Sequence, residues 1–176
     1  MKAAFTLASC ALLLAACAAT PEQQAASAVA KLGAKGGSQV SGEIKFTQVG
    51  SRVRIEGEVR GLAPGAKGFH IHEKGDCSAA DAASAGGHFD PREPKNWSTR
   101  HGGPHTAERH AGDLGNIVFD QYGKASVNMM AEGLAVDRGP IGILGRALVV
   151  HFLADDLKTE PTGAAGARAA CGVIEH

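Results

Sequence analysis

The chain has 176 residues, with 18 lysines and arginines against 18 aspartates and glutamates, so its formal net charge is zero. This balance argues against a nucleic-acid-binding surface, and any attraction for an anion must be local. Glycine is abundant at 24 residues, aromatic residues make up only 5%, and no long helical periodicity is present. The composition favours one domain of short strands joined by many turns.

The first residues have the features of an export signal. Met1-Lys2 precedes an apolar run, Ala3–Ala16, that is too short to span a membrane comfortably. The run ends in Leu14-Ala15-Ala16-Cys17, which resembles the bacterial lipobox, where cleavage leaves a lipid-modified cysteine as the first residue. We therefore expect a signal peptide over 1–16, cleavage before Cys17 and lipidation of Cys17. The alternative is ordinary cleavage among the neighbouring alanines.

A polar tether over 17–25 leads into 26–176, which we expect to form a single domain. In Arg52–Arg60 apolar residues alternate with charged ones, which indicates a strand with one buried face. Tyr122-Gly123 has the composition of a hairpin turn between two later strands. The predicted strands are Ser27–Leu32, Gln39–Thr47, Arg52–Arg60, Phe69–Glu73, Asn116–Gln121, Ala125–Met130, Arg146–Leu153 and Ala169–Ile174.

Two long stretches, Lys74–Asp113 and Asp155–Gly166, have neither strand nor helix periodicity. Loops of such length inside a compact domain are uncommon and usually functional. Eight short strands with two large loops predict an all-β domain, an antiparallel sandwich or barrel.

The four cysteines leave one pair in the mature domain. Cys10 lies in the predicted signal and Cys17 is the predicted lipid site, so Cys77 and Cys171 remain. In an exported chain such a pair favours a disulfide over free thiols. A metal site is less favoured because no C-x-x-C spacing accompanies them.

Histidines are the main anomaly of the sequence, because six of the eight lie between His70 and His110. In His70-Ile71-His72, residues two apart on a strand point to the same face, so both imidazoles can reach one ion. This pattern alone is weak evidence, since two ordinary histidines also produce it. His151 ends another apolar strand and is a candidate third ligand.

The first long loop adds three more histidines, His88, His101 and His110, with Asp113 three residues after the last. Imidazole and carboxylate ligands without thiolates suit zinc or copper. The residues alone therefore predict one or two metal sites bordered by loops, and they do not choose the reaction.

Six strings together carry a family resemblance. They are GFHIHEKGDC (68–77), GGHFDP (86–91), HGGP (101–104), RHAGDLGN (109–116), GRALVVH (145–151) and GARAACGVI (166–174). In this order, and covering nearly the whole mature chain, they resemble the copper–zinc superoxide dismutase family, in its bacterial exported form. The resemblance implies an eight-stranded antiparallel Greek-key β-barrel and an oxidoreductase with one copper and one zinc per chain. It also matches Cys77 and Cys171 to the family disulfide.

The resemblance implies two ligand sets with one shared member. The implied copper ligands are His70, His72, His88 and His151, and the implied zinc ligands are His88, His101, His110 and Asp113. Two superoxide radicals and protons would become dioxygen and hydrogen peroxide by one-electron cycling of copper, while zinc, which has no redox chemistry, keeps His88 in place. A rival zinc set uses His105 in place of His101.

Two further residues match family positions outside the ligand sets. Asp155 corresponds to the aspartate that hydrogen-bonds a copper histidine and a zinc histidine, here His70 and His101. Arg168 corresponds to the arginine beside the copper, whose planar fork can pair with a small anion. The implied catalytic residues are thus Arg168 and His88. Lys158 is an alternative steering residue in the last loop.

The same resemblance predicts the partners and location. Superoxide is the expected substrate, nucleic acid is not a partner, and the membrane is reached only through the lipid on Cys17. A homodimer is a candidate assembly, because the sequence does not reveal the oligomeric state. We expect the protein on the periplasmic side of a bacterial envelope. The alternative function is a non-catalytic copper-binding or chaperone-like protein on the same fold, against which the complete ligand sets and Arg168 argue.

Overall fold

A computed structural model describes residues 25–92 and 100–176. The predicted signal peptide, Cys17 and nearly all of the tether lie outside these ranges. Within them no helix has the length and apolarity needed to cross a bilayer. The elements are β1 (Ser27–Ala34), β2 (Ser41–Val49), β3 (Arg52–Arg60), β4 (Gly65–His72), the 3₁₀ turn η1 (Ala83–Ala85), β5 (Asp113–Phe119), β6 (Lys124–Glu132), β7 (Ala147–His151) and β8 (Arg168–Glu175).

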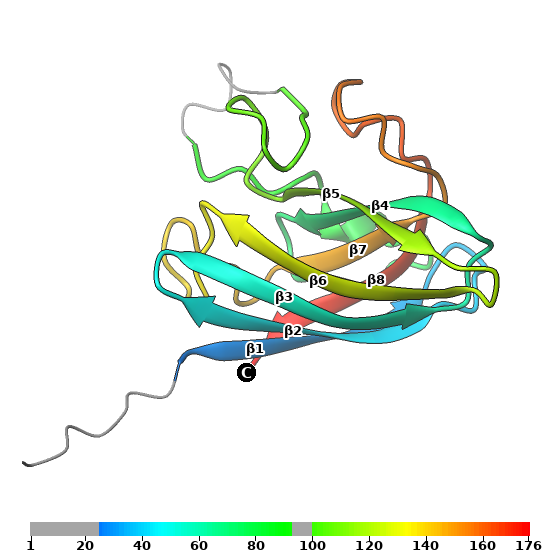
Figure 1. Ribbon diagram of the computed structural model, residues 1–176, viewed down its shortest axis with the longest axis horizontal. Helices are drawn as coiled ribbons and strands as arrows, with labels where there is room; N and C mark the ends of the chain where they lie inside the picture. Colours follow the sequence, from blue (N-terminus) through cyan, green and yellow to red (C-terminus); the bar gives the residue numbers. More distant parts are fainter. Residues whose placement is uncertain (1–24, 93–99) are drawn as a thin grey trace, which may run out of the picture.

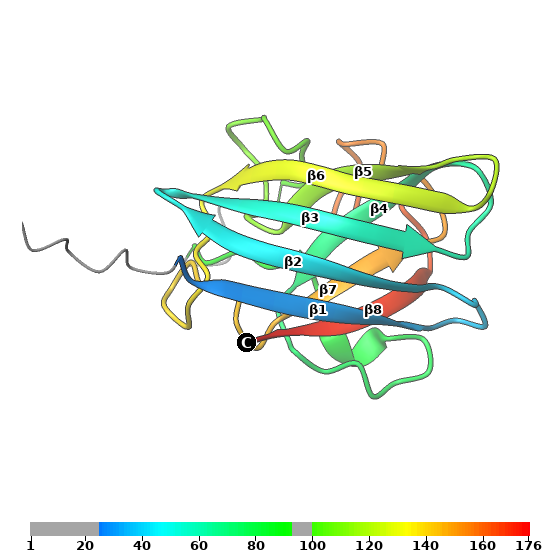
Figure 2. The same cartoon turned by 60° about the horizontal axis from the view of Figure 1, so that its bottom comes forward.

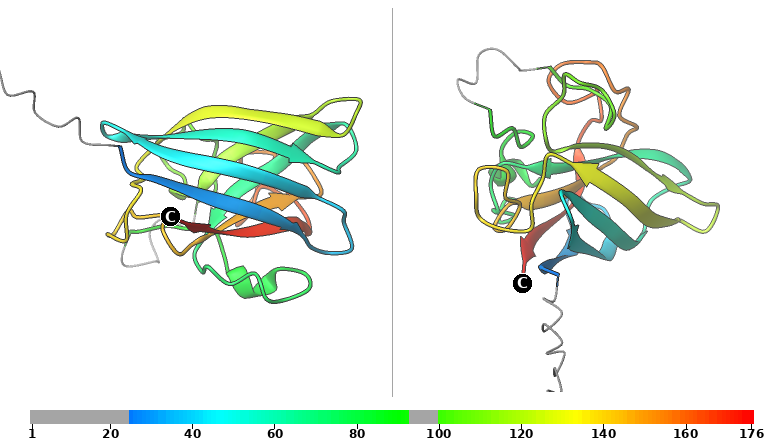
Figure 3. Two further views of the ribbon diagram at one scale, coloured as in Figure 1. Left: turned by 90° about the horizontal axis from the view of Figure 1, so that it is seen from below. Right: turned by 60° about the vertical axis from the view of Figure 1, so that its left-hand side comes forward.

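The eight strands form one sheet in the order β5-β4-β7-β8-β1-β2-β3-β6, and each neighbouring pair is antiparallel. The pairs β3–β6 and β4–β7 join strands that are not consecutive, as Greek-key connections require. The sheet curls until its two end strands, β5 and β6, contact each other (Figures 1 and 3). The all-β barrel of eight antiparallel strands predicted from the sequence is confirmed.

Strand β3 shows why the charged and apolar residues alternate. Val53, Ile55 and Val59 are fully buried in the barrel core. Gly57 lies between Ile55 and Val59 with φ of +152°, and a Cβ there would lie 2.1 Å from the Glu43 carbonyl oxygen. Only glycine allows β2 and β3 to approach this closely at that point.

The second part of β4, from Gly68 to His72, and the whole of β7 are buried on both faces, unlike β3. On β4, Phe69 and Ile71 belong to the barrel core, whereas His70 and His72 are fully buried away from it, beneath the loops. All five residues of β7 are buried in the same two-sided way. Figure 1 shows the long loops gathered over this side of the barrel. These two strands therefore form the floor of the candidate site.

Two strands begin earlier than the sequence predicts. β4 starts at Gly65 and not at Phe69, and β5 starts at Asp113, the last residue of the predicted loop. Backbone pairing between Gly65 and Phe119 extends the ladder over residues that have no strand periodicity of their own. The predicted hairpin is present, with Gly123 at φ of +72° between β5 and β6.

Candidate metal centre

The first cluster of ligand-type side chains is built on the ends of two paired strands. His70 and His72 lie on β4, and His151 follows a bulge at the end of β7, the strand that pairs with β4. His88 reaches the same place from the loop through an isolated bridge to His72. The ligand atoms of these four residues all lie within 4.8 Å of one another. We name His70, His72, His88 and His151 the strand group.

Three members of this group, His70, His72 and His151, lie on strands. In each of them one ring nitrogen contacts a protein oxygen and the other has no hydrogen-bond partner. His72 Nδ1 donates to the Gly86 carbonyl oxygen at 2.9 Å, and His151 Nδ1 donates to the Gly166 carbonyl oxygen at 3.0 Å. His70 Nε2 lies 2.8 Å from an Asp155 carboxylate oxygen. Such second contacts fix the tautomer and orientation of a ligand histidine.

The second cluster is built on the loop before β5 and on Asp113, the first residue of that strand. Its members are His88, His101, His110 and Asp113, which we name the loop group, and their ligand atoms also lie within 4.8 Å of one another. The Asp113 Oδ1 atom lies 2.7 Å from His88 Nδ1, 3.2 Å from His101 Nδ1 and 3.3 Å from His110 Nδ1. Backbone N–H groups of Gly102 and His110 donate to Asp113 Oδ2. This leaves Oδ1 facing three Nδ1 atoms.

His88 stands between the two groups. Its ring centroid is 4.1 Å from that of His70 and 5.3 Å from that of His101. Its Nδ1 faces Asp113 in the loop group, while its Nε2 is buried and has no hydrogen-bond partner. The two nitrogens of one imidazole thus serve two different groups.

Asp155, which belongs to neither group, contacts one histidine of each. Its Oδ2 lies 2.8 Å from His70 Nε2 and its Oδ1 lies 2.7 Å from His101 Nε2, with the carboxylate fully buried. Asn116 on β5 holds the Asp155 backbone, because it donates to the Asp155 carbonyl oxygen at 2.9 Å and accepts from its N–H at 2.8 Å. Sequence reasoning missed Asn116, although it ends the string RHAGDLGN.

Burial controls the charge of the strand group. It lowers the pKa of His151 to about 3 and that of His88 to about 4, and it holds the pKa of His72 well below its usual range. Desolvation disfavours the charged imidazolium, and neighbouring histidines add to the effect. These three imidazoles are therefore neutral near pH 7, which is the form that binds a metal.

The loop group has the opposite electrostatics. Burial would lower the pKa of His101, but hydrogen bonds and charge from Asp113 and Asp155 outweigh it and raise that pKa to about 10. Burial opposes the ionised form of Asp113 and Asp155 too, yet their histidine partners hold both pKa values well below the usual range. Because Asp113 and Asp155 are ionised and buried, positive charge beside them is needed to offset the cost of their burial.

The donor set fits metal ions better than it fits a protein interior without them. Among the described residues, five buried imidazole nitrogens have no hydrogen-bond partner: His70 Nδ1, His72 Nε2, His88 Nε2, His101 Nδ1 and His151 Nε2. Buried polar atoms are rarely left unpaired unless they have a function or an unseen ligand. Imidazoles with one carboxylate and no thiolate match copper and zinc.

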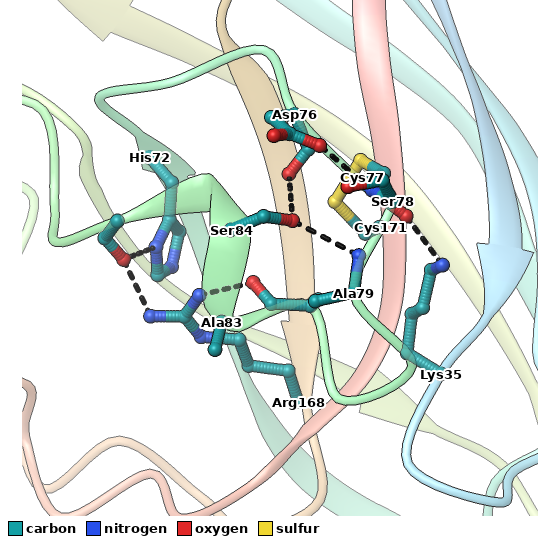
Figure 4. The surroundings of a disulfide bond; sticks show 12 residues. Lys35, His72, Asp76, Cys77, Ser78, Ala79, Ala83, Ser84, Arg168 and Cys171 are labelled. Atoms are coloured by element: carbon teal, nitrogen blue, oxygen red, sulfur yellow. Dashed lines mark hydrogen bonds between the residues drawn. A yellow bond between two sulfur atoms is a disulfide. The ribbon is translucent and has the colours of Figure 1, made fainter.

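Arg168, at the start of β8, is anchored beside the strand group. Its guanidinium donates to the carbonyl oxygens of Ala82 and Gly86. The Gly86 carbonyl also accepts from His72, so the arginine and that histidine share one acceptor, as the surroundings of Arg168 in Figure 4 show.

The disulfide joins this same loop to β8. Cys77 and Cys171 are bonded, with Cα atoms 5.7 Å apart and a sequence separation of 94. Figure 2 shows η1 and its loop lying beside β8. The disulfide predicted from the sequence is confirmed.

Two alternative residues lie apart from the groups. His105 is exposed and belongs to neither group, so the structure does not bring it to the place that the rival zinc set required. Lys158 is exposed in the last loop, where its backbone N–H donates to Asp156.

Fold and site together define a class of protein: a metal-binding protein whose buried histidines form two adjoining candidate ion sites on an antiparallel barrel. Residues 40–174 match the protein family described as copper/zinc superoxide dismutase. The chain therefore belongs to the copper/zinc superoxide dismutase family. Its function is superoxide dismutation, and its cofactors are copper and zinc.

Individual relatives agree with this assignment. The chain is 43% identical over 145 residues to superoxide dismutase [Cu-Zn] 4 of Dictyostelium discoideum, covering 78% of this chain and 92% of that one. It is 41% identical over 143 residues to an extracellular superoxide dismutase [Cu-Zn] of Caenorhabditis elegans, covering 78% of this chain and 62% of the nematode protein. The solved structure of the clock protein EA4 is 41% identical, with a TM-score of 0.76 over 86% of this chain and 95% of that one.

Proposed function

We propose that dismutation takes place at the strand group, which holds copper, while the loop group holds zinc and His88 belongs to both. The observation that supports this assignment is the set of five buried imidazole nitrogens without a hydrogen-bond partner, of which His101 Nδ1 alone faces a carboxylate, that of Asp113. When bound, copper supplies the one-electron redox chemistry that converts two superoxide radicals and two protons to dioxygen and hydrogen peroxide, and redox-inert zinc supplies charge and fixed geometry.

His88 is the residue of the chain best placed to handle a proton beside the substrate. Its Nδ1 is committed to the Asp113 side, whereas its Nε2 has no protein partner and faces the strand group. A proton held at His88 Nε2 would lie among the histidines where the substrate reacts. Asp155 fixes the rings on either side, since it contacts both His70 and His101.

Arg168 is the proposed anion guide. It is half-buried, and backbone carbonyls of Ala82 and Gly86 hold its guanidinium next to His72. The chain has no net charge, so global attraction cannot gather superoxide. A fixed planar cation beside the strand group attracts a small anion locally and pairs with it geometrically.

Pulse radiolysis of Arg168→Glu over a series of salt concentrations tests this proposal. Local field focusing raises association rates by about 10–1000-fold, so the second-order rate should fall at least tenfold while both metals stay bound. Arg168→Lys should fall between, because it keeps the charge but loses the fork. The wild-type rate should decline as salt increases, and the glutamate variant should flatten or reverse that slope. A metal-replete Arg168→Glu protein with the wild-type rate and slope would leave Lys158 as the candidate guide.

We also propose that the protein is exported by a bacterium and anchored by a lipid on Cys17, on the periplasmic side of the envelope. The apolar segment Ala3–Ala16 and the adjoining Cys17 support export, as does the Cys77–Cys171 disulfide, because such bonds persist in oxidising compartments. Relatives named extracellular superoxide dismutases agree with secretion. Mass spectrometry of the mature N-terminus tests it, and an unmodified terminus beyond Cys17 would contradict lipidation.

The domain boundaries at 1–16, 17–25 and 26–176 stay predictions, as does the homodimer. Sedimentation velocity of the purified protein over a concentration series tests the homodimer, which requires a species of twice the chain mass. A single species of one chain mass at all concentrations would contradict it.

A further inference from the structure

We propose that Lys35, in the turn between β1 and β2, is a positioning residue for Arg168 and His72, acting through the loop that carries the disulfide. The inference rests on the role proposed above for Arg168. Lys35 has no contact with either histidine group, and its effect must pass through backbone groups of residues 77–86.

The turn is attached to the disulfide loop at two points. Lys35 is half-buried, and its Nζ donates to the Cys77 carbonyl oxygen at 2.5 Å. The next residue, Gly36, donates its N–H to the Ala80 carbonyl oxygen at 2.9 Å. Figure 4 shows the Lys35 side chain reaching the disulfide loop beside Cys77. The disulfide fixes the Cys77 side chain, whereas Lys35 fixes the direction of its carbonyl.

The same turn is attached to the strand from which Arg168 projects. The Lys35 N–H donates to the Ala169 carbonyl oxygen at 2.8 Å, and the Ser38 hydroxyl donates to the same oxygen at 2.5 Å. Gly36 lies so close that a Cβ there would be 2.7 Å from the Arg168 carbonyl oxygen. The turn therefore holds the backbone at Arg168 and the loop that receives its guanidinium in one arrangement.

The loop transmits this arrangement to the site through two carbonyls. Ala82 and Gly86 accept from the Arg168 guanidinium, and Gly86 also accepts from His72 Nδ1. Beyond Cys77 the loop is largely exposed, and its underside rests on β7 through small side chains of Ala82 and Ala85. With such slight packing, the charge-assisted hydrogen bond at Cys77 contributes to the order of the loop, together with the disulfide and the hydrogen bonds within the loop.

The test compares Lys35→Met with Lys35→Arg and with the control Lys31→Met. Lys31 is exposed on β1 and makes no described side-chain contact, so its replacement removes the same charge without touching the turn. Hydrogen exchange by mass spectrometry is measured on peptides covering 78–87, in the metal-loaded and in the metal-free protein. The dissociation constant of azide, a small anion, is measured by optical titration of the copper-loaded protein.

Lys35→Met should speed exchange over 78–87 about tenfold, the loss expected when a charged hydrogen-bond donor is removed, and should raise the azide dissociation constant about threefold or more. Lys35→Arg should restore most of both values, and Lys31→Met should change neither. Unchanged exchange in Lys35→Met would overturn the proposal. Faster exchange with unchanged azide binding would overturn the link to Arg168.

The role of Arg168 itself is checked separately by azide binding to Arg168→Glu. If that variant bound azide as tightly as the wild type, the anion-guide function would fail. The exchange result on 78–87 would then still decide whether Lys35 orders the loop.

Discussion

The strand group and the loop group contain similar metal-ligand side chains, but different physical interactions hold those side chains in place. In the strand group, His70, His72 and His151 project from paired strands, so the backbone ladder sets their spacing. In the loop group, His101 and His110 lie on irregular chain and are oriented by the carboxylates of Asp113 and Asp155. The fold preorganises the first set, whereas mutual charge organises the second.

The electrostatics follow the same division. His72 and His151 use the backbone carbonyls of Gly86 and Gly166 as their second contacts, and burial lowers the pKa of both, so they are neutral near pH 7. Loop residues form a charged network in which His101 has a raised pKa and Asp113 a lowered one. The strand group should therefore keep its geometry without metal, while the loop group depends on a positive charge between its members.

The largest effect should come from His88→Ala, because His88 is the member common to both groups. Loss of contacts behind a ligand costs about 10–100-fold in metal affinity, so loss of a shared ligand should cost more than about 100-fold for each metal. Elemental analysis after dialysis against a chelator measures this. The control is His105→Ala, which removes an exposed histidine of neither group. A His88→Ala protein that kept one full equivalent of either metal would refute the sharing.

A matched pair, His151→Ala and His110→Ala, tests the division directly. His151→Ala should lose copper and keep zinc, and His110→Ala should do the reverse, each by more than about 100-fold in affinity for the lost metal. In the metal-free proteins, His110→Ala should leave hydrogen exchange of β4 and β7 unchanged, because the ladder holds those strands. If His110→Ala removed copper as readily as zinc, the two groups would be one cooperative unit.

The sequence was sufficient for the strand-borne part of the site. His70-Ile71-His72 shows period-two placement, and His151 ends an apolar run, so their approach follows from strand geometry. The residues alone did not place His88, His101 and His110 relative to one another, because a long loop has no periodicity to read. Only the family resemblance paired them, and the structure brings His101, not His105, to Asp113.

Contacts made through the backbone were beyond sequence reasoning. Gly86 and Gly166 act through carbonyl oxygens, which every residue has, so their identity carries no signal of that role. Lys35 is one lysine among many, and its partner is again a carbonyl, that of Cys77. The early starts of β4 and β5 were missed for a related reason, since pairing with a neighbour decided them.

Asp155→Asn should have the next largest effect. Both carboxylate oxygens face a ring nitrogen, Oδ2 facing His70 and Oδ1 facing His101, and an asparagine can accept from only one of them while its NH₂ opposes the other. The affinity for the metals should fall about 10–100-fold, as for other contacts behind ligands. Competition with a chelator of known affinity measures it for each metal. Equal affinities in variant and wild type would show that the rings are fixed without Asp155.

Asn116→Ala should have the smallest effect, and it should lower the stability of the fold more than it lowers the affinity for the metals. The substitution removes two neutral hydrogen bonds to the Asp155 backbone, each contributing about 0.5–1.5 kcal/mol, so the free energy of unfolding should fall by roughly 1–3 kcal/mol. The Asp155 carboxylate keeps the Leu157 N–H as a donor at 2.6 Å, and its two histidine partners remain. Metal affinity should consequently fall less than about tenfold, which is a smaller loss than the loss of about 10–100-fold expected for Asp155→Asn.

Urea unfolding and chelator competition on the same Asn116→Ala protein separate these two effects. Asn128→Ala is the control, because Asn128 is exposed on β6 and its replacement should change neither quantity. Metal loss as severe as in Asp155→Asn would mean that the two Asn116 hydrogen bonds to the Asp155 backbone set the position of Asp155, and that the contacts of its carboxylate do not. The loop group would then depend on strand β5 through Asn116 as well as through Asp113, and the distinction between ligands fixed by strands and ligands fixed by charge would have to be abandoned.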